Sequence, residues 1–430
     1  MDAMQFSAII IRKTQHAQPA FWYTANMDGK ATKRIGLLIE RTRAFGRELC
    51  EGIISYAQER DDWEIAFLNV TDVKSLRKMR DIDGFIARVT SETLARDLKR
   101  TSRPVVDVYY DFAHKDFAVV KTKHERIGVL AAEHFLDRHF RNFAYCPYGG
   151  GRTSRYCQLS FTRRLRREGF GCAVYGGRDA GRYEFDDSAV IAETIGLPRV
   201  VKSLEKWLRS LKKPVAVFCP GDLRAWQLIN VCRLAGLDVP REVAVLGLDN
   251  DMILCGSSRP MLSSIDPDTR RIGRVAAETL AGMMDGSAPK SQIVRQVDPA
   301  GIVARKSTET IPDAPSWLSD ALVFIRRNAK NGISATDVFR MLGRSHTIVT
   351  RAFRSALGTT VQRAIADARL DEARRLLIGS DASIKQIAAL SGFASVSYML
   401  QAFTAKFGVP PGAWRRQQAS RVKESRRDAS

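Results

Sequence analysis

Short apolar runs alternate with amphipathic stretches from residue 33 to about residue 304. The runs have the length and composition of buried strands, and the stretches between them carry apolar residues at the three- and four-residue spacing of a helix. Strands are predicted at 35–39, 64–68, 84–87, 105–109, 142–145, 171–174, 215–218 and 243–248, with helices such as 47–60, 127–138 and 224–235. This alternation predicts parallel sheets with helical crossovers. The region of 33–304 is too long for one compact sheet domain, so two α/β lobes are expected.

The pattern changes to helices alone near residue 316. Residues 305–316 are polar and contain two prolines, which predicts a linker. Gly and Ser residues then separate the amphipathic segments of a helical domain over 317–416. Its helices are predicted at 317–328, 333–342, 345–357, 361–378, 383–390 and 395–407. Residues 1–32 show no period and are expected to form a disordered extension, and 417–430 a basic tail.

Two of the turns between these helices have the form of a helix-turn-helix unit. In each, a short helix ends at a glycine and a capped helix begins within a few residues. The turn glycines, Gly343 and Gly392, lie 49 residues apart and are joined by one long helix. Two units arranged in this way can enter successive major grooves of double-stranded DNA.

The distribution of charge supports a nucleic-acid partner. The chain carries a net charge of +21, and 19 Lys and Arg against 8 Asp and Glu lie in residues 316–430. The density of positive charge is therefore about three times higher in this region than in the rest of the chain, which favours phosphate binding over a uniform compositional bias.

Other classes of protein find little support in the sequence. No apolar run approaches the length of a membrane helix, and no signal peptide is recognisable, so a cytoplasmic protein is expected. The seven cysteines form no C-x-x-C pair and avoid the C-terminal region, which excludes a zinc finger there. No catalytic or nucleotide-binding motif is present and the six histidines do not cluster, so no enzyme, cofactor or metal is predicted.

The second helix-turn-helix unit resembles the AraC family of transcription regulators almost position by position. The residues that carry the resemblance are Ile387, Ala388, Gly392, Phe393, Ser397, Tyr398, Phe403, Phe407, Gly408, Pro411, Trp414 and Arg415. The resemblance covers about 317–416 and implies sequence-specific DNA binding.

Helix geometry divides the two expected recognition helices into faces. In 345–357, the apolar residues Ile348, Val349, Ala352 and Phe353 are expected in the core, and in 395–407 Met399, Phe403 and Phe407. The opposite faces carry the predicted DNA contacts, which are His346, Thr347, Thr350, Arg351, Arg354, Ser395, Ser397, Gln401 and Lys406. Arg351 can pair with guanine and Gln401 with adenine, whereas Ser395 and Lys406 suit phosphates. A solvated helix face is the alternative for each of them.

The region 33–303 resembles the periplasmic-binding-protein-like effector domains of LacI-type regulators. The resemblance rests on segments 45–63, 218–225 and 245–250. A LacI-type domain ahead of an AraC-type domain is similar to the XylR-like regulators, which implies a sugar bound between two lobes and a homodimer. Asp222 and Asp249 follow strand ends, where α/β sheets bind ligands, and Arg47 opens a helix after the first strand. All three are predicted effector contacts, with capping or loop stabilisation as the alternative for the carboxylates.

The chain departs from this family at several pocket positions. Lys123 and His124 stand where the family usually has Asp and Asn, and Cys157 replaces a frequent Arg. With Lys121 and Arg152 nearby, an acidic or phosphorylated sugar and a loss of sugar binding both stay open as alternatives to a pentose. Two further readings differ in class: a DNA binder whose lobes only dimerise, and a sugar-acting enzyme fused to a DNA-binding module.

Overall fold

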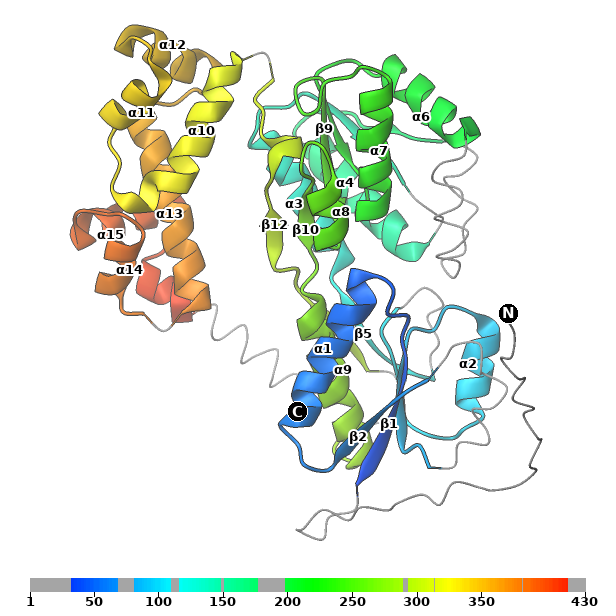
Figure 1. Ribbon diagram of the computed structural model, residues 1–430. Helices are drawn as coiled ribbons and strands as arrows, with labels where there is room; N and C mark the ends of the chain where they lie inside the picture. Colours follow the sequence, from blue (N-terminus) through cyan, green and yellow to red (C-terminus); the bar gives the residue numbers. More distant parts are fainter. Residues whose placement is uncertain are drawn as a thin grey trace, which may run out of the picture.

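A computed structural model describes residues 32–68, 81–109, 116–147, 151–176, 198–288, 293–312, 314–380 and 382–416. It contains two α/β lobes, stacked one on the other, and a helical domain beside the lobe that contains β9 (Figure 1). The expected N-terminal extension, except residue 32, and the expected basic tail lie outside the described residues.

The first lobe is built on a parallel six-stranded sheet with strand order β11-β5-β4-β3-β1-β2. Its strands are β1 (Lys33–Leu38), β2 (Trp63–Phe67), β3 (Gly84–Ala87), β4 (Val105–Asp107), β5 (Ala118–Thr122) and β11 (Val294–Val297). Helices α1 (Ala44–Gln58) and α9 (Thr269–Met284) cover one face and α2 (Glu92–Lys99) the other. Apolar clusters fill both faces, which explains why β3 has no polar residue and why the buried part of β1, after Arg34, has none.

The second lobe repeats this plan with strand order β12-β10-β9-β8-β6-β7. Its strands are β6 (Asn142–Tyr145), β7 (Ala173–Val174), β8 (Val215–Phe218), β9 (Val243–Leu248), β10 (Ser263–Asp266) and β12 (Gly301–Val303). Helices α3 (His124–Leu136) and α4 (Arg152–Arg167) pack on one face. Helices α6 (Pro198–Ser210) and α7 (Asp222–Leu234) pack on the other, and the short α8 (Met252–Ser257) follows β9. Only β12, among the described strands, pairs antiparallel to its neighbour.

The chain crosses between the lobes between β5 and α3, between β10 and α9, and between β11 and β12. These crossings place the beginnings of several helices at the boundary between the lobes. Asp268, at the second crossing, and Gly301, at the third, have positive φ angles of 60° and 136°. Three short segments therefore join the lobes, an arrangement that suits a cleft between them.

The helical domain contains two small cores joined by one long helix. Helices α10 (Ser316–Asn328), α11 (Ala335–Leu342) and α12 (His346–Leu357) enclose the first core, and α14 (Ile384–Leu390) and α15 (Val396–Phe407) the second. Helix α13 (Val361–Gly379) contributes Ile365 to the first core and Leu370, Ala373 and Leu377 to the second. The predicted fold, two parallel α/β lobes followed by an all-helical domain with two helix-turn-helix units, is confirmed.

The first part of the expected linker is not a free spacer. Residues Lys306–Thr308 form a 3-10 helix, η2, whose residues Ser307 and Thr308 are fully buried against the second lobe. The Ser307 hydroxyl donates to the Val245 carbonyl at 2.6 Å and accepts from the amide of Ser263 at 2.8 Å. The polar composition of this segment reflects hydrogen bonds to the sheet rather than contact with water.

The core prediction for α12 was wrong at one position. Val349 and Phe353 are fully buried, but the side chain of Ile348 is 51% exposed. Successive residues of a helix differ by about 100° in direction, so Val349 faces the core while Ile348 points away from it. In α15 the expected core residues Met399 and Phe403 are buried and Phe407 is half-buried.

Candidate effector cleft and nucleic-acid interface

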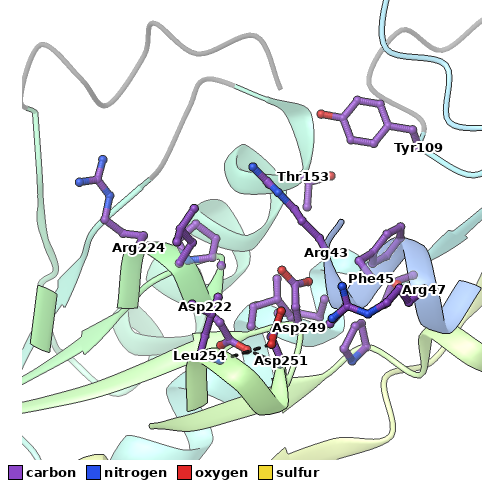
Figure 2. A pocket seen from close by; sticks show the side chains of 18 of the residues that line it. Arg43, Phe45, Arg47, Tyr109, Thr153, Asp222, Arg224, Asp249, Asp251 and Leu254 are labelled. Atoms are coloured by element: carbon purple, nitrogen blue, oxygen red, sulfur yellow. Dashed lines mark hydrogen bonds between the residues drawn. The ribbon is translucent and has the colours of Figure 1, made fainter. Parts of the chain in front are cut away.

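A pocket of about 350 Å³ lies between the two lobes. It is lined from the first lobe by the β1–α1 turn and the ends of β3, β4 and β5, and from the second lobe by the beginnings of α3, α4, α7 and α8. Figure 2 shows side chains from both lobes turned toward this space. The three predicted effector residues, Arg47, Asp222 and Asp249, all lie in its lining.

The carboxylate of Asp222 is held in the wall by hydrogen bonds from three groups. Its Oδ2 accepts from the amide of Asp251 at 2.7 Å and from the Cys255 thiol at 3.4 Å, and its Oδ1 accepts from the Ser264 hydroxyl at 2.6 Å (Figure 2 shows the bond to Asp251). A Cβ atom at Gly247 would stand only 2.1 Å from Oδ1, so this position must be glycine. Burial raises the pKa of Asp222 well above its usual value. Asp222 thus joins α8 and β10 to α7, and its ligand contact stays a prediction.

Asp249 occupies a different position in the pocket. It follows β9 directly and has a positive φ of 104°. Burial raises its pKa to about 7, against the opposing effect of the nearby Arg43 and Arg88 guanidinium groups. Since this carboxyl is half ionised near neutral pH, it can donate or accept a hydrogen bond from a polyol.

Arg47 supports the β1–α1 turn. Its Nη1 donates to the carbonyl of Thr42 at 2.6 Å and to that of Arg41 at 3.3 Å. The guanidinium therefore shapes the loop that forms one wall of the pocket, and its remaining donors are those that a ligand could use.

Five pocket residues on the first lobe and its crossing were not predicted as contacts: Arg43, Arg88, Tyr109, Lys121 and His124. Arg88 follows β3 and Tyr109 follows β4, so the rule that α/β sheets bind ligands at the carboxyl ends of strands would have found them. The second lobe adds Thr153 and Arg224, which were also missed.

Lys121 and His124 lie side by side at the first crossing. Lys121 is 6% exposed, and its Nζ lies 5.6 Å from the centre of the Tyr156 ring. Burial lowers the pKa of Lys121, while Glu125 raises it. Burial, with Lys121 nearby, lowers the pKa of His124 to about 4, so this imidazole is neutral at physiological pH.

In the first helix-turn-helix unit, the predicted contact residues form the outer face of α12. His346, Thr347, Arg351 and Arg354 are exposed and Thr350 is half-buried. Ser345 caps the helix through a hydrogen bond from the Ile348 amide, and Gly358 ends it in the left-handed conformation. The His346 ring also packs edge-on against Phe339, 4.6 Å between centroids, so it has a structural contact in addition to its exposed edge.

In the second unit, Ser395, Ser397, Gln401 and Lys406 are exposed on or beside α15. Ser395 caps this helix by accepting from the Tyr398 amide. Lys406 is directed back toward α13, where its Nζ lies 3.1 Å from Asp367 Oδ1 and 3.4 Å from Asp371 Oδ1. These carboxylates compete with a phosphate for Lys406, and its predicted phosphate contact stays untested.

The described residues contain no helix long and apolar enough to cross a membrane. Nor do they contain a group of three or more His, Cys, Asp or Glu side chains placed to hold a metal ion.

Comparison with known proteins identifies both regions. A model of the periplasmic binding protein-like domain matches residues 132–308, and a model of the helix-turn-helix domain matches residues 338–417. The xylose operon regulatory protein of Escherichia coli strain K12 is 25% identical over 394 residues, which cover 89% of this chain and 96% of that protein. The HTH-type transcriptional repressor PurR of Photobacterium profundum is 25% identical over 264 residues, 58% of this chain and 74% of that protein.

A solved structure gives the same picture at the level of the fold. The structure of the xylose-binding transcription activator xylR matches with a TM-score of 0.55 and 24% identity, covering 89% of this chain and 97% of that one. The match extends over the lobes and the helical domain in the same order along the chain. This chain therefore joins a periplasmic-binding-protein-like domain to a C-terminal helix-turn-helix domain and is similar over nearly its whole length to the xylose operon regulatory proteins.

Proposed function

We propose that this protein binds operator DNA through α12 and α15 and that a small polyol, bound between the lobes, controls that binding. The observation that carries the proposal is the presence in one chain of an interlobe pocket and two capped recognition helices with exposed polar faces. The curated relatives named above are regulators of transcription, which favours this reading over a sugar-acting enzyme.

The control requires that the ligand bind one arrangement of the lobes more tightly than another. Helix α3 offers a physical connection, because its first residue lines the pocket and its last turn lies near the helical domain. His134 and Arg138, at its far end, bond to Thr308 of η2, and burial, together with the charge of Arg326 in α10, lowers the pKa of Arg138. A change in lobe closure that moves α3 would therefore reach the segment that leads into the DNA-binding domain. The protein would act as a cytoplasmic homodimer on repeated half-sites, as the resemblance to XylR-like regulators implies.

The DNA contact can be tested on an operator selected from genomic fragments by repeated rounds of binding. Arg351→Ala should weaken the affinity by about 1–3 kcal/mol and relax the preference at one base position, because it removes a bidentate contact to a base edge. Fluorescence anisotropy with a panel of single-base operator variants measures both effects. Arg166→Ala, which removes an exposed arginine of α4 in the second lobe, is the matched control. Equal affinities for the parent and Arg351→Ala would contradict the role given to α12.

An effector-independent DNA binder is the competing function. The two differ in a simple observable, since a ligand that binds only the folded lobes raises the melting temperature and must alter operator affinity if it controls the protein. Unchanged operator affinity in the presence of a saturating bound ligand would support the competing function.

A further inference from the structure

The lining of the interlobe pocket carries an excess of positive charge. Its cationic side chains are Arg43, Arg47, Arg88, Lys121 and Arg224, whereas its carboxylates are Asp222, Asp249 and Asp251. Asp222 is hydrogen-bonded within the wall, as described above, and Asp251 accepts from the amides of Ile253 and Leu254 as the cap of α8. Burial raises the pKa of Asp249 to about 7, so this carboxyl is partly neutral. The lining therefore holds five cationic side chains against three carboxyl groups, and two of these carboxyl groups have raised pKa values.

The backbone adds partial positive charge at the pocket. Helices α1, α3, α4 and α7 all begin at the pocket, and at least 13 residues make up each of them. Their N-cap residues, Arg43, Lys123, Gly151 and Gly221, make no side-chain cap hydrogen bond. Ser or Thr side chains cap α2, α12, α13, α14 and α15, and Asp251 caps α8 at the pocket, whereas α9 and α10 also lack a side-chain cap bond. An uncapped helix N-terminus presents amide donors and a partial positive charge, both of which suit an anion.

Cationic residues at two of these N-termini strengthen the argument. Arg43 is the N-cap of α1 and Arg152 is the first residue of α4, where like charge opposes the helix dipole. An anion bound at the beginning of α4 would relieve the repulsion there, whereas a neutral sugar would leave it in place.

One ring nitrogen in the pocket lining is buried and unsatisfied among the described residues. The Nδ1 atom of His124 is buried and has no hydrogen-bond partner among the described residues, and the residue is 8% exposed. Lys121 stands beside it, nearly buried, and Arg152 is close enough to lower the pKa of that lysine. Helices α3 and α4 are in close contact here, since a Cβ atom at Gly128 would stand 2.4 Å from the Cys157 carbonyl. Lys121, His124 and the beginning of α4 therefore converge on one side of the pocket.

We propose that the effector is a monosaccharide-sized polyol carrying one anionic group, a carboxylate or a phosphate, and that this group binds between Lys121, His124 and the N-terminus of α4. The hydroxyl groups then face Asp249 and the arginines of the first lobe. A volume of about 350 Å³ is near the lower end of the range of small-molecule pockets, which suits one sugar unit. This inference rests on the proposed control by a ligand and specifies the chemical class of that ligand.

Isothermal titration calorimetry on the full chain tests the inference with matched compounds. D-Glucose and D-xylose represent neutral sugars, D-glucuronate and D-gluconate sugar acids, D-glucose 6-phosphate and D-ribose 5-phosphate sugar phosphates, and inorganic phosphate the anion alone. At least one anionic sugar should bind 10-fold or more tightly than its neutral counterpart, and the two anionic sets distinguish a carboxylate from a phosphate. Raising the salt concentration should weaken that binding and leave the binding of a neutral sugar unchanged.

Variants locate the anionic group. Lys121→Gln should reduce the affinity for the anionic sugar at least 10-fold, and Lys202→Gln, on the exposed side of α6, should leave it unchanged. Since Lys121 is nearly buried, His124→Asn serves as a second variant if circular dichroism shows that Lys121→Gln is unfolded, and it should reduce the same affinity. A neutral sugar that binds more tightly than every anionic compound would overturn the inference. So would the absence of binding by the whole set, or binding that neither variant alters.

The outcome for the proposed function is separate. A neutral sugar that binds and changes operator affinity would leave ligand control standing while rejecting an anionic effector. An anionic sugar that binds in a Lys121-dependent manner without changing operator affinity would support an anionic ligand and reject ligand control of DNA binding.

Discussion

Thr308 connects the pocket-lining helix to the segment that leads into the DNA-binding domain. Its hydroxyl is fully buried and lies 2.9 Å from His134 Nε2 and 2.8 Å from Ser263 Oγ. The substitution Thr308→Val keeps the shape of the side chain and removes both hydrogen bonds. Ser263 Oγ retains its bonds to the amide and carbonyl of Arg305, at 2.7 and 2.9 Å, so only the imidazole of His134 loses its partner.

The cost of this change follows from the burial of His134. Burial lowers the pKa of this histidine well below its usual value, so it cannot gain a compensating charge. Leaving one buried polar group unsatisfied costs about 1–3 kcal/mol, and we expect a loss of about 2 kcal/mol in the free energy of unfolding. Urea unfolding followed by circular dichroism and tryptophan fluorescence measures this loss, with the m-value as a check that the unfolding reaction is unchanged.

Thr279→Val provides the matched control. Thr279 is equally buried, but its hydroxyl donates only to the Val275 carbonyl one turn earlier in α9, and this carbonyl keeps its helical partner. Its loss should cost about 0.5 kcal/mol or less. If Thr308→Val were no more destabilising than Thr279→Val, the buried connection would not have the energetic role assigned to it. The Thr308 variant should also reduce the effect of a bound ligand on operator affinity, whereas the Thr279 variant should not.

Three other consequences can be checked independently. The pKa of Asp249 is about 7 in the folded protein and about 3.9 in the unfolded chain. The free energy of unfolding therefore falls by up to about 1.4 kcal/mol per pH unit as the pH rises toward 7. The stability advantage of Asp249→Asn, measured by urea unfolding, should therefore grow between pH 5 and 7 and level off above 7; a pH-independent difference would refute this. Gly128→Ala should cost about 1–3 kcal/mol by forcing α3 from α4, while Gly171→Ala, with open space around it, should be neutral by the same measurement. Phe403→Ala, at a fully buried site in the second helix-turn-helix core, should cost about 3–5 kcal/mol and abolish specific binding in an anisotropy assay; retained operator affinity would count against the role of this unit.

The sequence predicted most strongly those elements whose apolar pattern is continuous. Strands β3, β6, β8 and β9 have the predicted bounds, because both faces of each are buried and nearly every residue is apolar. The helices of the C-terminal domain were placed within two residues of their bounds, because Ser and Thr caps and left-handed glycines mark their ends in the sequence.

Four strands were missed, and β10 shows why. Its residues Ser263 and Ser264 are fully buried, but they are polar and broke the expected apolar pattern. Their hydroxyl groups are satisfied by residues far along the chain, Arg305 and Thr308 for Ser263 and Asp222 for Ser264. A pattern read from neighbouring residues contains no information about such partners. Strand β5 was missed for a similar reason, since it contains the buried Lys121.

The same limit applies to the pocket. Asp222 and Asp249 could be predicted because each follows a strand that was itself predicted. Lys121 and His124 could be recognised only as departures from a family pattern, because their role depends on the approach of α4, whose Gly151 and Thr153 lie about 30 residues further along the chain. The difference between Asp222, whose carboxyl is hydrogen-bonded into the wall, and Asp249, whose pKa is raised to about 7 beside two arginines, depends on contacts that only the fold brings together.

Hydroxyl-radical footprinting on a selected operator, with and without a bound ligand, tests the central account most directly. Because α12 and α15 belong to two units joined by α13, each C-terminal domain should protect two segments about one helical turn apart, and a ligand that binds the pocket should change the concentration needed for protection. Uniform protection without sequence preference, or a footprint that a saturating pocket ligand leaves unaltered, would contradict the account of a ligand-controlled, sequence-specific DNA-binding protein.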